Sequence, residues 1–114
     1  MWKIRITFES LSVTAELNAS SRAQALVAAL PISSEAKVWG DEIYFDTPVA
    51  QGEEDAQAKV PSGTVAYWPV GKALCLLFGQ TPYSPVNVAG TLNGDPAVLA
   101  GVKEGEGGWS AASR

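Results

Sequence analysis

Residues 65–90 read VAYWPVGKALCLLFGQTPYSPVNVAG, and this stretch decides the fold. Two runs of β-forming residues, 65–68 and 72–78, flank the loop Pro-Val-Gly at 69–71. A three-residue loop that ends in glycine favours a tight hairpin, because glycine adopts a positive φ without strain. The predicted register pairs Val65 with Cys75, Ala66 with Leu74, Tyr67 with Ala73, and Trp68 with Lys72.

The second strand of this hairpin lacks polar alternation. Residues 73–78 read ALCLLF, so we expect both of its faces to be buried at the centre of a sheet. The loop that follows, GQTPYSP at 79–85, brings hydroxyl, amide and aromatic side chains to the end of the strand. Binding sites commonly lie on such loops, which a rigid strand holds in place. The sequence therefore places a candidate binding groove beside residues 78–87.

The composition is that of one globular domain. The chain has 114 residues, of which 46% are hydrophobic and 18% are charged. It contains no apolar run of roughly 20 residues, the length that spans a membrane, and residues 1–5 enter a strand pattern without the apolar core of a signal peptide. We therefore expect a cytoplasmic protein. The folded domain is expected over residues 1–103, followed by a flexible tail, rich in Gly and Ser, over residues 104–114.

Charge and missing side chains exclude several classes of function. The net charge is −4, and the eight basic residues are scattered singly, which argues against nucleic acid and anionic membranes as partners. A single cysteine excludes an internal disulfide, and the absence of histidine excludes Ser-His-Asp and Cys-His catalysis. Imidazole metal ligands are absent for the same reason, so we expect neither a metal nor another cofactor.

The first third of the chain predicts two strands and one helix. Residues 3–9 and 11–17 alternate between apolar and polar side chains, as in an antiparallel pair with one wet face. The period then changes, and an apolar stripe predicts a helix over residues 21–30. Ser21 followed by Gln24 resembles a capping box, and Pro31 ends the helix because it lacks an amide proton.

Further strands are predicted along the remaining chain. Residues 36–45 form a hairpin around Gly40-Asp41, with Val38 opposite Ile43. Residues 46–62 are mostly loop, with a short edge strand possible within 56–60, and 86–92 and 96–102 are strands joined by the turn Asn93-Gly94. Seven or eight short strands and one main helix predict a mostly β protein, a compact antiparallel barrel of about eight strands with the helix covering one end.

Several segments resemble one family, the small bacterial and archaeal cyclophilin-like proteins. They are residues 40–45 (GDEIYF), Gly63, 65–69 (VAYWP), 71–79 (GKALCLLFG), Thr81-Pro82 and 85–88 (PVNV). The resemblance extends from Ile4 to Val102 and implies a closed antiparallel β-barrel of the cyclophilin type. It brings no established activity with it, and related barrels also occur in subunits of carboxylase-like and oxoprolinase-like enzymes.

The resemblance also suggests prolyl isomerase activity, which in true cyclophilins needs an arginine that polarises the prolyl amide. The arginines here are Arg5, Arg22 and Arg114, which we place on a wet strand face, at a helix start and in the tail. The companion histidine and the methionine-containing segment of true cyclophilins are missing, so an efficient isomerase is not expected. Cys75 lies in an apolar strand without a base, and is expected to be a buried filler.

The predicted ligand-binding residues are aromatic side chains and polar groups on or near the central hairpin. They are Tyr44, Tyr67, Phe78, Gln80, Thr81, Tyr83, Ser84 and Asn87. Packing of the barrel is the alternative for the tyrosines and for Trp68. We expect a binding module for a small molecule or a short peptide. Two alternatives remain open: an enzyme on the same barrel, as a weak prolyl isomerase or a component of a hydrolase or carboxylase assembly, and a homo-oligomer subunit whose aromatic patch is an interface.

Overall fold

The computed structural model describes residues 2–79 and 85–112, which form nine strands, one α-helix and one 3₁₀-helix. In chain order these are β1 (Trp2–Phe8), β2 (Ser12–Leu17), α1 (Ser21–Ala28), β3 (Ile32–Glu35), β4 (Lys37–Trp39), β5 (Glu42–Asp46), β6 (Thr64–Trp68), β7 (Ala73–Leu77), β8 (Asn87–Leu92), η1 (Pro96–Gly101) and β9 (Gly107–Ala112). No helix among these residues is long and apolar enough to cross a bilayer.

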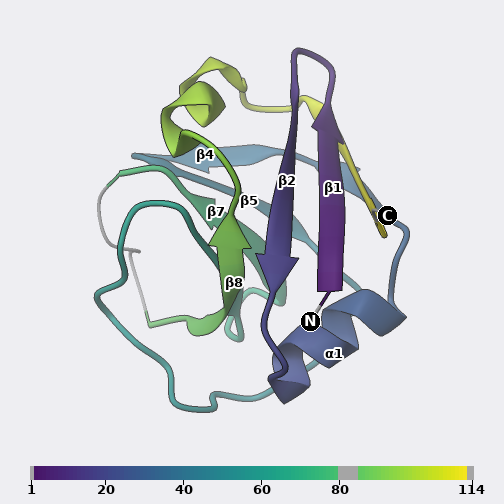
Figure 1. Ribbon diagram of the computed structural model, residues 1–114, viewed down its shortest axis with the longest axis vertical. Helices are drawn as coiled ribbons and strands as arrows, with labels where there is room; N and C mark the ends of the chain where they lie inside the picture. The colour runs from purple at the N-terminus through teal and green to yellow at the C-terminus, as the bar shows by residue number, and fades with distance from the viewer. Residues whose placement is uncertain (1, 80–84, 113–114) are drawn as a thin grey trace.

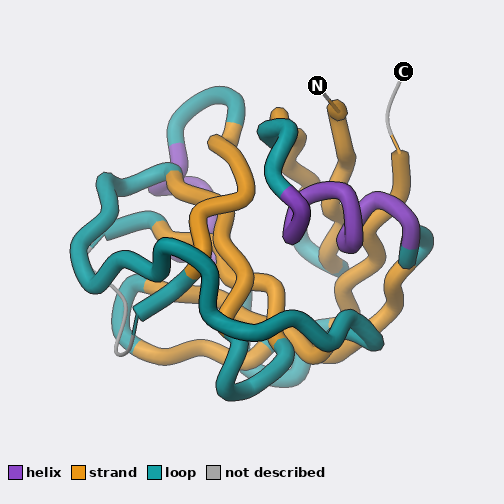
Figure 2. Tube along the Cα trace, turned by 90° about the horizontal axis from the view of Figure 1, so that it is seen from below, coloured by secondary structure: helices purple, strands orange, loops and turns teal. Residues whose placement is uncertain are grey.

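The strands form one antiparallel sheet that closes almost completely into a barrel (Figure 1). Their order is β3-β9-β1-β2-β8-β6-β7-β5-β4. The two outermost strands, β3 and β4, follow one another in the sequence and are joined by Ala36, which brings the ends of the sheet together. Helix α1 lies at one end of the barrel, and Figure 2 views the molecule from that end. The predicted fold class, a mostly β antiparallel barrel, is confirmed.

Alternating apolar side chains fill the barrel interior. Ile4, Ile6 and Phe8 of β1 point inward, as do Val13 and Leu17 of β2, and all five are buried. The two strands pair antiparallel, with Ile6 opposite Val13. The period-two pattern of the sequence therefore identified the core face of both strands correctly.

The two predicted hairpins had different outcomes. In β4–β5 the register is as predicted, with Val38 opposite Ile43, and Gly40 takes a φ of +56°. In β6–β7 it is shifted by one residue, so that Trp68 faces Ala73 and Tyr67 faces Leu74. The reason is that Lys72, with a φ of +51°, is the left-handed residue of a four-residue loop, in place of the glycine before it.

Other expectations about secondary structure were wrong near the C-terminus. Residues 96–101 form the 3₁₀-helix η1, because Asp95 caps its amide at Ala97 and Pro96 occupies the first turn. The expected flexible tail instead contains β9, which pairs with β1 and with β3. Two differences lie earlier in the chain. Strand β3 was not predicted, and the possible edge strand within residues 56–60 is reduced, among the described residues, to a single bridge between Gln57 and Val86.

The helix begins at Ser21, as predicted, and ends at Ala28, before the predicted end at residue 30; its N-cap lies one residue before the one that the capping-box pattern indicated. Ser20 is the N-cap, and its hydroxyl accepts a hydrogen bond from the amide of Ala23. The side chain of Gln24 donates to the carbonyl of Ala19. The long loop between β5 and β6 passes below the same end of the barrel as α1 in Figure 1, so helix and loop cover this end together.

Candidate functional site

Strand β7 divides two apolar clusters on opposite faces of the sheet. Its side chains are fully buried on both faces, as the sequence predicted. Leu74 and Leu76 belong to the barrel interior, whereas Cys75 and Leu77 belong to a second cluster on the other face. We call this second group the outer cluster; its buried members are Val60, Ala66, Cys75, Leu77 and Val86, and Tyr44, Trp68 and Val88 are half-buried against it.

Two aromatic rings are among the half-buried members of the outer cluster. Tyr44 and Trp68 meet edge to face, with ring centroids 5.9 Å apart and planes at 83°. The ammonium nitrogen of Lys37 lies 6.0 Å from the Tyr44 ring centroid and 3.3 Å from a carboxylate oxygen of Asp46. Among the described residues the Tyr44 hydroxyl has no hydrogen-bond partner, so this polar group is available at the edge of the cluster.

The indole of Trp68 is held firmly but its N–H group is not paired. A Cβ atom placed on Gly71 would lie 2.5 Å from two ring carbons of Trp68, so glycine is needed there for the ring to pack against the turn. The indole nitrogen is buried and has no hydrogen-bond partner in the described part of the chain. Buried polar groups are usually paired, so the unpaired indole N–H is an exception that calls for an explanation.

A carboxyl and a thiol lie together in the same cluster. Glu42 and Tyr44 share one face of β5, and Glu42 is opposite Leu77. Burial raises the pKa of the Glu42 carboxyl, and a hydrogen bond from the Cys75 thiol partly offsets this effect. Burial, with the neighbouring Glu42, raises the pKa of the Cys75 thiol well above its usual value, so the thiol is protonated at neutral pH and is a poor nucleophile.

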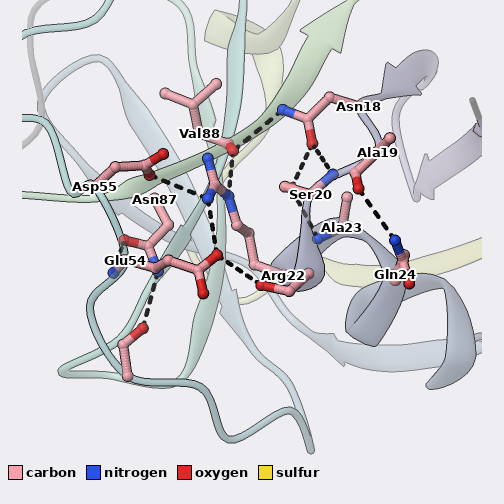
Figure 3. Close-up of polar contacts among 12 residues, drawn as sticks. Asn18, Ala19, Ser20, Arg22, Ala23, Gln24, Glu54, Asp55, Asn87 and Val88 are labelled. Carbon is pink, nitrogen blue, oxygen red and sulfur yellow. Dashed lines mark hydrogen bonds and ion pairs between the residues drawn. The ribbon is translucent and has the colours of Figure 1, made fainter.

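A second polar cluster surrounds Arg22 at the end of the barrel that α1 covers (Figure 3). The guanidinium donates from Nε to the carbonyl of Val88 at 2.7 Å, and Nη1 contacts Glu54 at 3.2 Å and Asp55 at 3.0 Å. Only 7% of Arg22 is exposed, whereas both acidic side chains are largely exposed. Arg22 therefore ties α1 to strand β8 and to the loop between β5 and β6.

A bulge in β8 presents the carbonyl that Arg22 binds. Val65 pairs with Gly90 and Ala66 pairs with Val88, so Ala89 is an extra residue in β8. The Val88 carbonyl also accepts a 3.3 Å hydrogen bond from the side chain of Asn18. The residues of this cluster bind one another, and their contacts join helix, strand and loop at this end of the barrel.

The structure separates the predicted site residues. Tyr67 and Asn87 are fully buried on the inner side, where each hydrogen-bonds the backbone of the loop between β5 and β6. Phe78 packs at the border of the interior core, and Tyr44 lies in the outer cluster. The other four, Gln80, Thr81, Tyr83 and Ser84, lie outside the described residues.

The sequence analysis missed two features of the outer cluster. Glu42 escaped notice, although period-two alternation places it on the same face as Tyr44. Trp68 was assigned to packing or binding without a decision, because an unpaired indole N–H cannot be read from sequence. Of the arginines considered for isomerase chemistry, Arg5 is exposed on β1, Arg22 is bound by two carboxylates, and Arg114 lies outside the described residues.

Comparisons with known proteins agree with the fold. A family model described as Cyclophilin-like matches residues 2–107. The solution structure of the hypothetical protein AF2241 from Archaeoglobus fulgidus is 40% identical to this chain, with a TM-score of 0.82, and the match covers 98% of this chain and 95% of that one. No curated protein matches the sequence.

A more distant likeness is to the structure of McbB in complex with tryptophan. It has 20% identity and a TM-score of 0.78, and the match covers 95% of this chain but only 44% of McbB. The chain therefore spans under half the length of McbB, and the likeness is one of fold.

Proposed function

Because the chain belongs to the cyclophilin-like family, whose fold alone assigns no activity, we propose that it is a binding module for a small molecule or a short peptide, and that the outer cluster is its site. The observation that carries this proposal is the buried indole N–H of Trp68, which has no partner among the described residues. A carbonyl or carboxylate oxygen of a ligand would supply the missing acceptor.

The surroundings of Trp68 suit a ligand that combines an apolar group with a few polar atoms. The rings of Tyr44 and Trp68 offer a wall for an aromatic or aliphatic group, above the apolar side chains of the outer cluster. The Tyr44 hydroxyl and the Lys37 ammonium add donors near the same rings. Ligand sites commonly have this character, mostly apolar with a few placed polar groups.

The proposal excludes a nucleophilic mechanism at this site. The cluster's thiol is protonated at neutral pH, and the chain has no histidine to serve as a base. Tyr67 and Asn87, predicted as ligand contacts, are committed to the loop backbone, so we assign them to the framework of the site. Tyr44 remains a proposed contact.

The test is a titration of ¹⁵N-labelled protein followed by the indole N–H signals in NMR spectra. The sequence has four tryptophans, so the Trp68 signal is assigned by comparison with Trp68→Phe. The probes are tryptophan, because a protein of this fold has been solved with it, and a short Xaa-Pro peptide. A saturable shift of the Trp68 signal supports the proposal, with the exposed Trp2 on β1 as the internal reference.

The same titration separates the alternatives. Exchange cross-peaks between the cis and trans forms of the peptide would establish isomerase activity and replace the proposal of a pure binding module. A Trp68 signal that moves with protein concentration alone would indicate an interface between copies of the chain. If the Trp68 signal stays unchanged at the highest concentration of both probes, neither probe binds at Trp68 and the proposal is wrong for both.

A further inference from the structure

The outer cluster contains a second unpaired polar atom, on Glu42. Only 8% of this residue is exposed, and its Oε1 atom has no hydrogen-bond partner among the residues that the structure describes. Two other buried polar side chains of the barrel are paired: Asn87 bonds to Gly52 and Glu54, and Tyr67 bonds to Val49 and Gln51. Glu42 and Trp68 share the lack of a partner with one further described side chain, Ser110 on β9, whose buried group is a neutral hydroxyl.

The two unpaired groups flank the same pair of residues. Cys75 of β7 and Tyr44 of β5 face one another across the strands. The Glu42 carboxyl hydrogen-bonds with the Cys75 thiol, and the Trp68 ring packs against the Tyr44 ring. The carboxyl oxygen and the indole N–H thus both adjoin the outer cluster, and they have opposite hydrogen-bonding character.

Charge further limits the ligand. Asp46 follows Glu42 and Tyr44 on the same face of β5, but its side chain is 64% exposed and paired with Lys37 at 3.3 Å, so the buried carboxyl at the cluster is that of Glu42. An anionic ligand group placed beside the Glu42 carboxyl would bring two negative charges together in a buried position, which is unfavourable. A neutral or cationic N–H group has no such penalty and supplies the donor that Oε1 lacks.

We infer that Glu42 anchors an N–H donor of the ligand, so that the site takes amides or amines in preference to esters and carboxylates. This inference rests on the proposed function, since it concerns the same outer cluster. An amide carries the kind of donor that Glu42 lacks, an N–H, and the kind of acceptor that the Trp68 indole lacks, a carbonyl oxygen. A primary ammonium shares the N–H chemistry but leaves the indole unmatched.

The experiment compares four compounds that share a phenylethyl group. They are N-(2-phenylethyl)acetamide, its ester analogue 2-phenylethyl acetate, 2-phenylethylamine and 3-phenylpropanoate. Amide and ester differ by one N–H group replaced by oxygen, so their ratio of affinities isolates the donor. Dissociation constants come from the Trp68 indole signal of the native protein.

The native protein is expected to bind the amide about tenfold more tightly than the ester, the ratio that one hydrogen bond of ordinary strength gives. The carboxylate should bind most weakly. The comparison of amine with amide identifies the kind of N–H donor that the site prefers. Tighter binding of the amine than of the amide indicates ammonium ligands, and tighter binding of the amide indicates amides. Equal affinity for amide and ester, or tighter binding of the carboxylate, would overturn the inference while leaving a binding site in place. No binding of any of the four would overturn both proposals for this class of ligand.

Two variants show whether Glu42 provides the discrimination. Glu42→Met removes both oxygens at similar volume, so the preference for amide over ester should disappear, while the melting temperature stays unchanged or rises. Glu42→Gln retains a carbonyl oxygen and should keep part of the preference. A purely structural role for Glu42 predicts instead that Glu42→Met lowers the melting temperature and weakens amide and ester equally.

Discussion

The phenolic hydroxyl of Tyr67 donates a 2.6 Å hydrogen bond to the carbonyl oxygen of Val49, in the loop that joins β5 to β6. The phenolic oxygen of Tyr67 also accepts a 3.1 Å hydrogen bond from the amide of Gln51. Tyr67 is completely buried and its bond to Val49 is shielded from water, whereas its bond from Gln51 is partly buried. One side chain of the central hairpin thus fixes the start of a loop that covers the end of the barrel.

Replacing Tyr67 by phenylalanine is expected to lower the free energy of unfolding by about 1–3 kcal/mol, because it leaves the buried Val49 carbonyl and the partly buried Gln51 amide without this partner. Urea denaturation measures this change. The matched control is Tyr44→Phe, whose hydroxyl has no partner among the described residues, and which should change stability by less than about 0.5 kcal/mol. Equal effects of the two substitutions would mean that the loop does not depend on Tyr67.

Replacing Arg22 by methionine should destabilise the protein by about 1–2 kcal/mol, measured in the same way. The value lies below that for breaking a fully buried ion pair, because the side chains of Glu54 and Asp55 are 55% and 66% exposed and regain water. The control Arg5→Met removes an exposed guanidinium whose one contact among the described residues is a 3.5 Å bond to Ser12, and should have little effect. A loss as small as that of the control would exclude Arg22 as a tie between helix and loop.

Much of the barrel could be predicted because its determinants are local. Period-two alternation identified the inward faces of β1 and β2, and Gly40 set the correct register of its hairpin. The β6–β7 register was missed because Lys72 adopts a backbone conformation that sequence rules assign to glycine. The glycine beside it serves another need, the packing of the Trp68 ring.

The candidate site depended more on contacts between distant segments. Asn87 pairs with Gly52 and Glu54, which lie 35 and 33 residues away, and no local pattern shows this. The same holds for β9, whose Gly- and Ser-rich sequence is typical of a flexible tail but lies between β1 and β3 in the sheet. Propensity there is overruled by pairing with strands from the other end of the chain.

Replacing Lys72 by glycine should raise the free energy of unfolding by about 0.5–1 kcal/mol, because it relieves a left-handed conformation that costs an ordinary residue roughly 1–2 kcal/mol. Urea denaturation is again the measurement. In Lys59→Gly, where no positive φ occurs, the same change should be neutral or slightly destabilising. Lower stability of the Lys72 variant would show that its side chain contributes more than the turn strain costs.

Stability should fall in acid partly through Glu106. Hydrogen bonds from the amide of Lys103, and then from Ser10, lower the pKa of this carboxyl. A lowered pKa in the folded state stabilises the protein above the unfolded value of about 4.3, and this contribution is lost as the pH falls through the folded-state pKa. Glu106→Gln should therefore be less stable than the native protein at neutral pH, with the difference shrinking below about pH 4.

Urea midpoints at several pH values test this, with Glu16→Gln as the control, since the Glu16 side chain on β2 forms no hydrogen bond or ion pair among the described residues. The control should follow the native protein at every pH. A difference between the Glu106 variant and the native protein that stays constant with pH would exclude the carboxylate as its source.

Strands β2 and β8 pair so closely at Gly90 that we expect no side chain to be tolerated there. A Cβ atom there would lie 2.2 Å from the carbonyl oxygen of Glu16 and 2.8 Å from the Cα of Leu17, both backbone atoms that cannot rotate away. Gly90→Ala should therefore destabilise the protein by about 3 kcal/mol, the upper end of overpacking penalties, or prevent folding.

Gly52→Ala is the control, because a Cβ there meets no atom within 4 Å and its φ is not positive. Its stability should stay the same or rise by up to about 1 kcal/mol through the lower entropy of the unfolded chain. A Gly90 variant as stable as this control would mean that the two strands have room to separate, and that β2 and β8 do not pack as closely as their register implies.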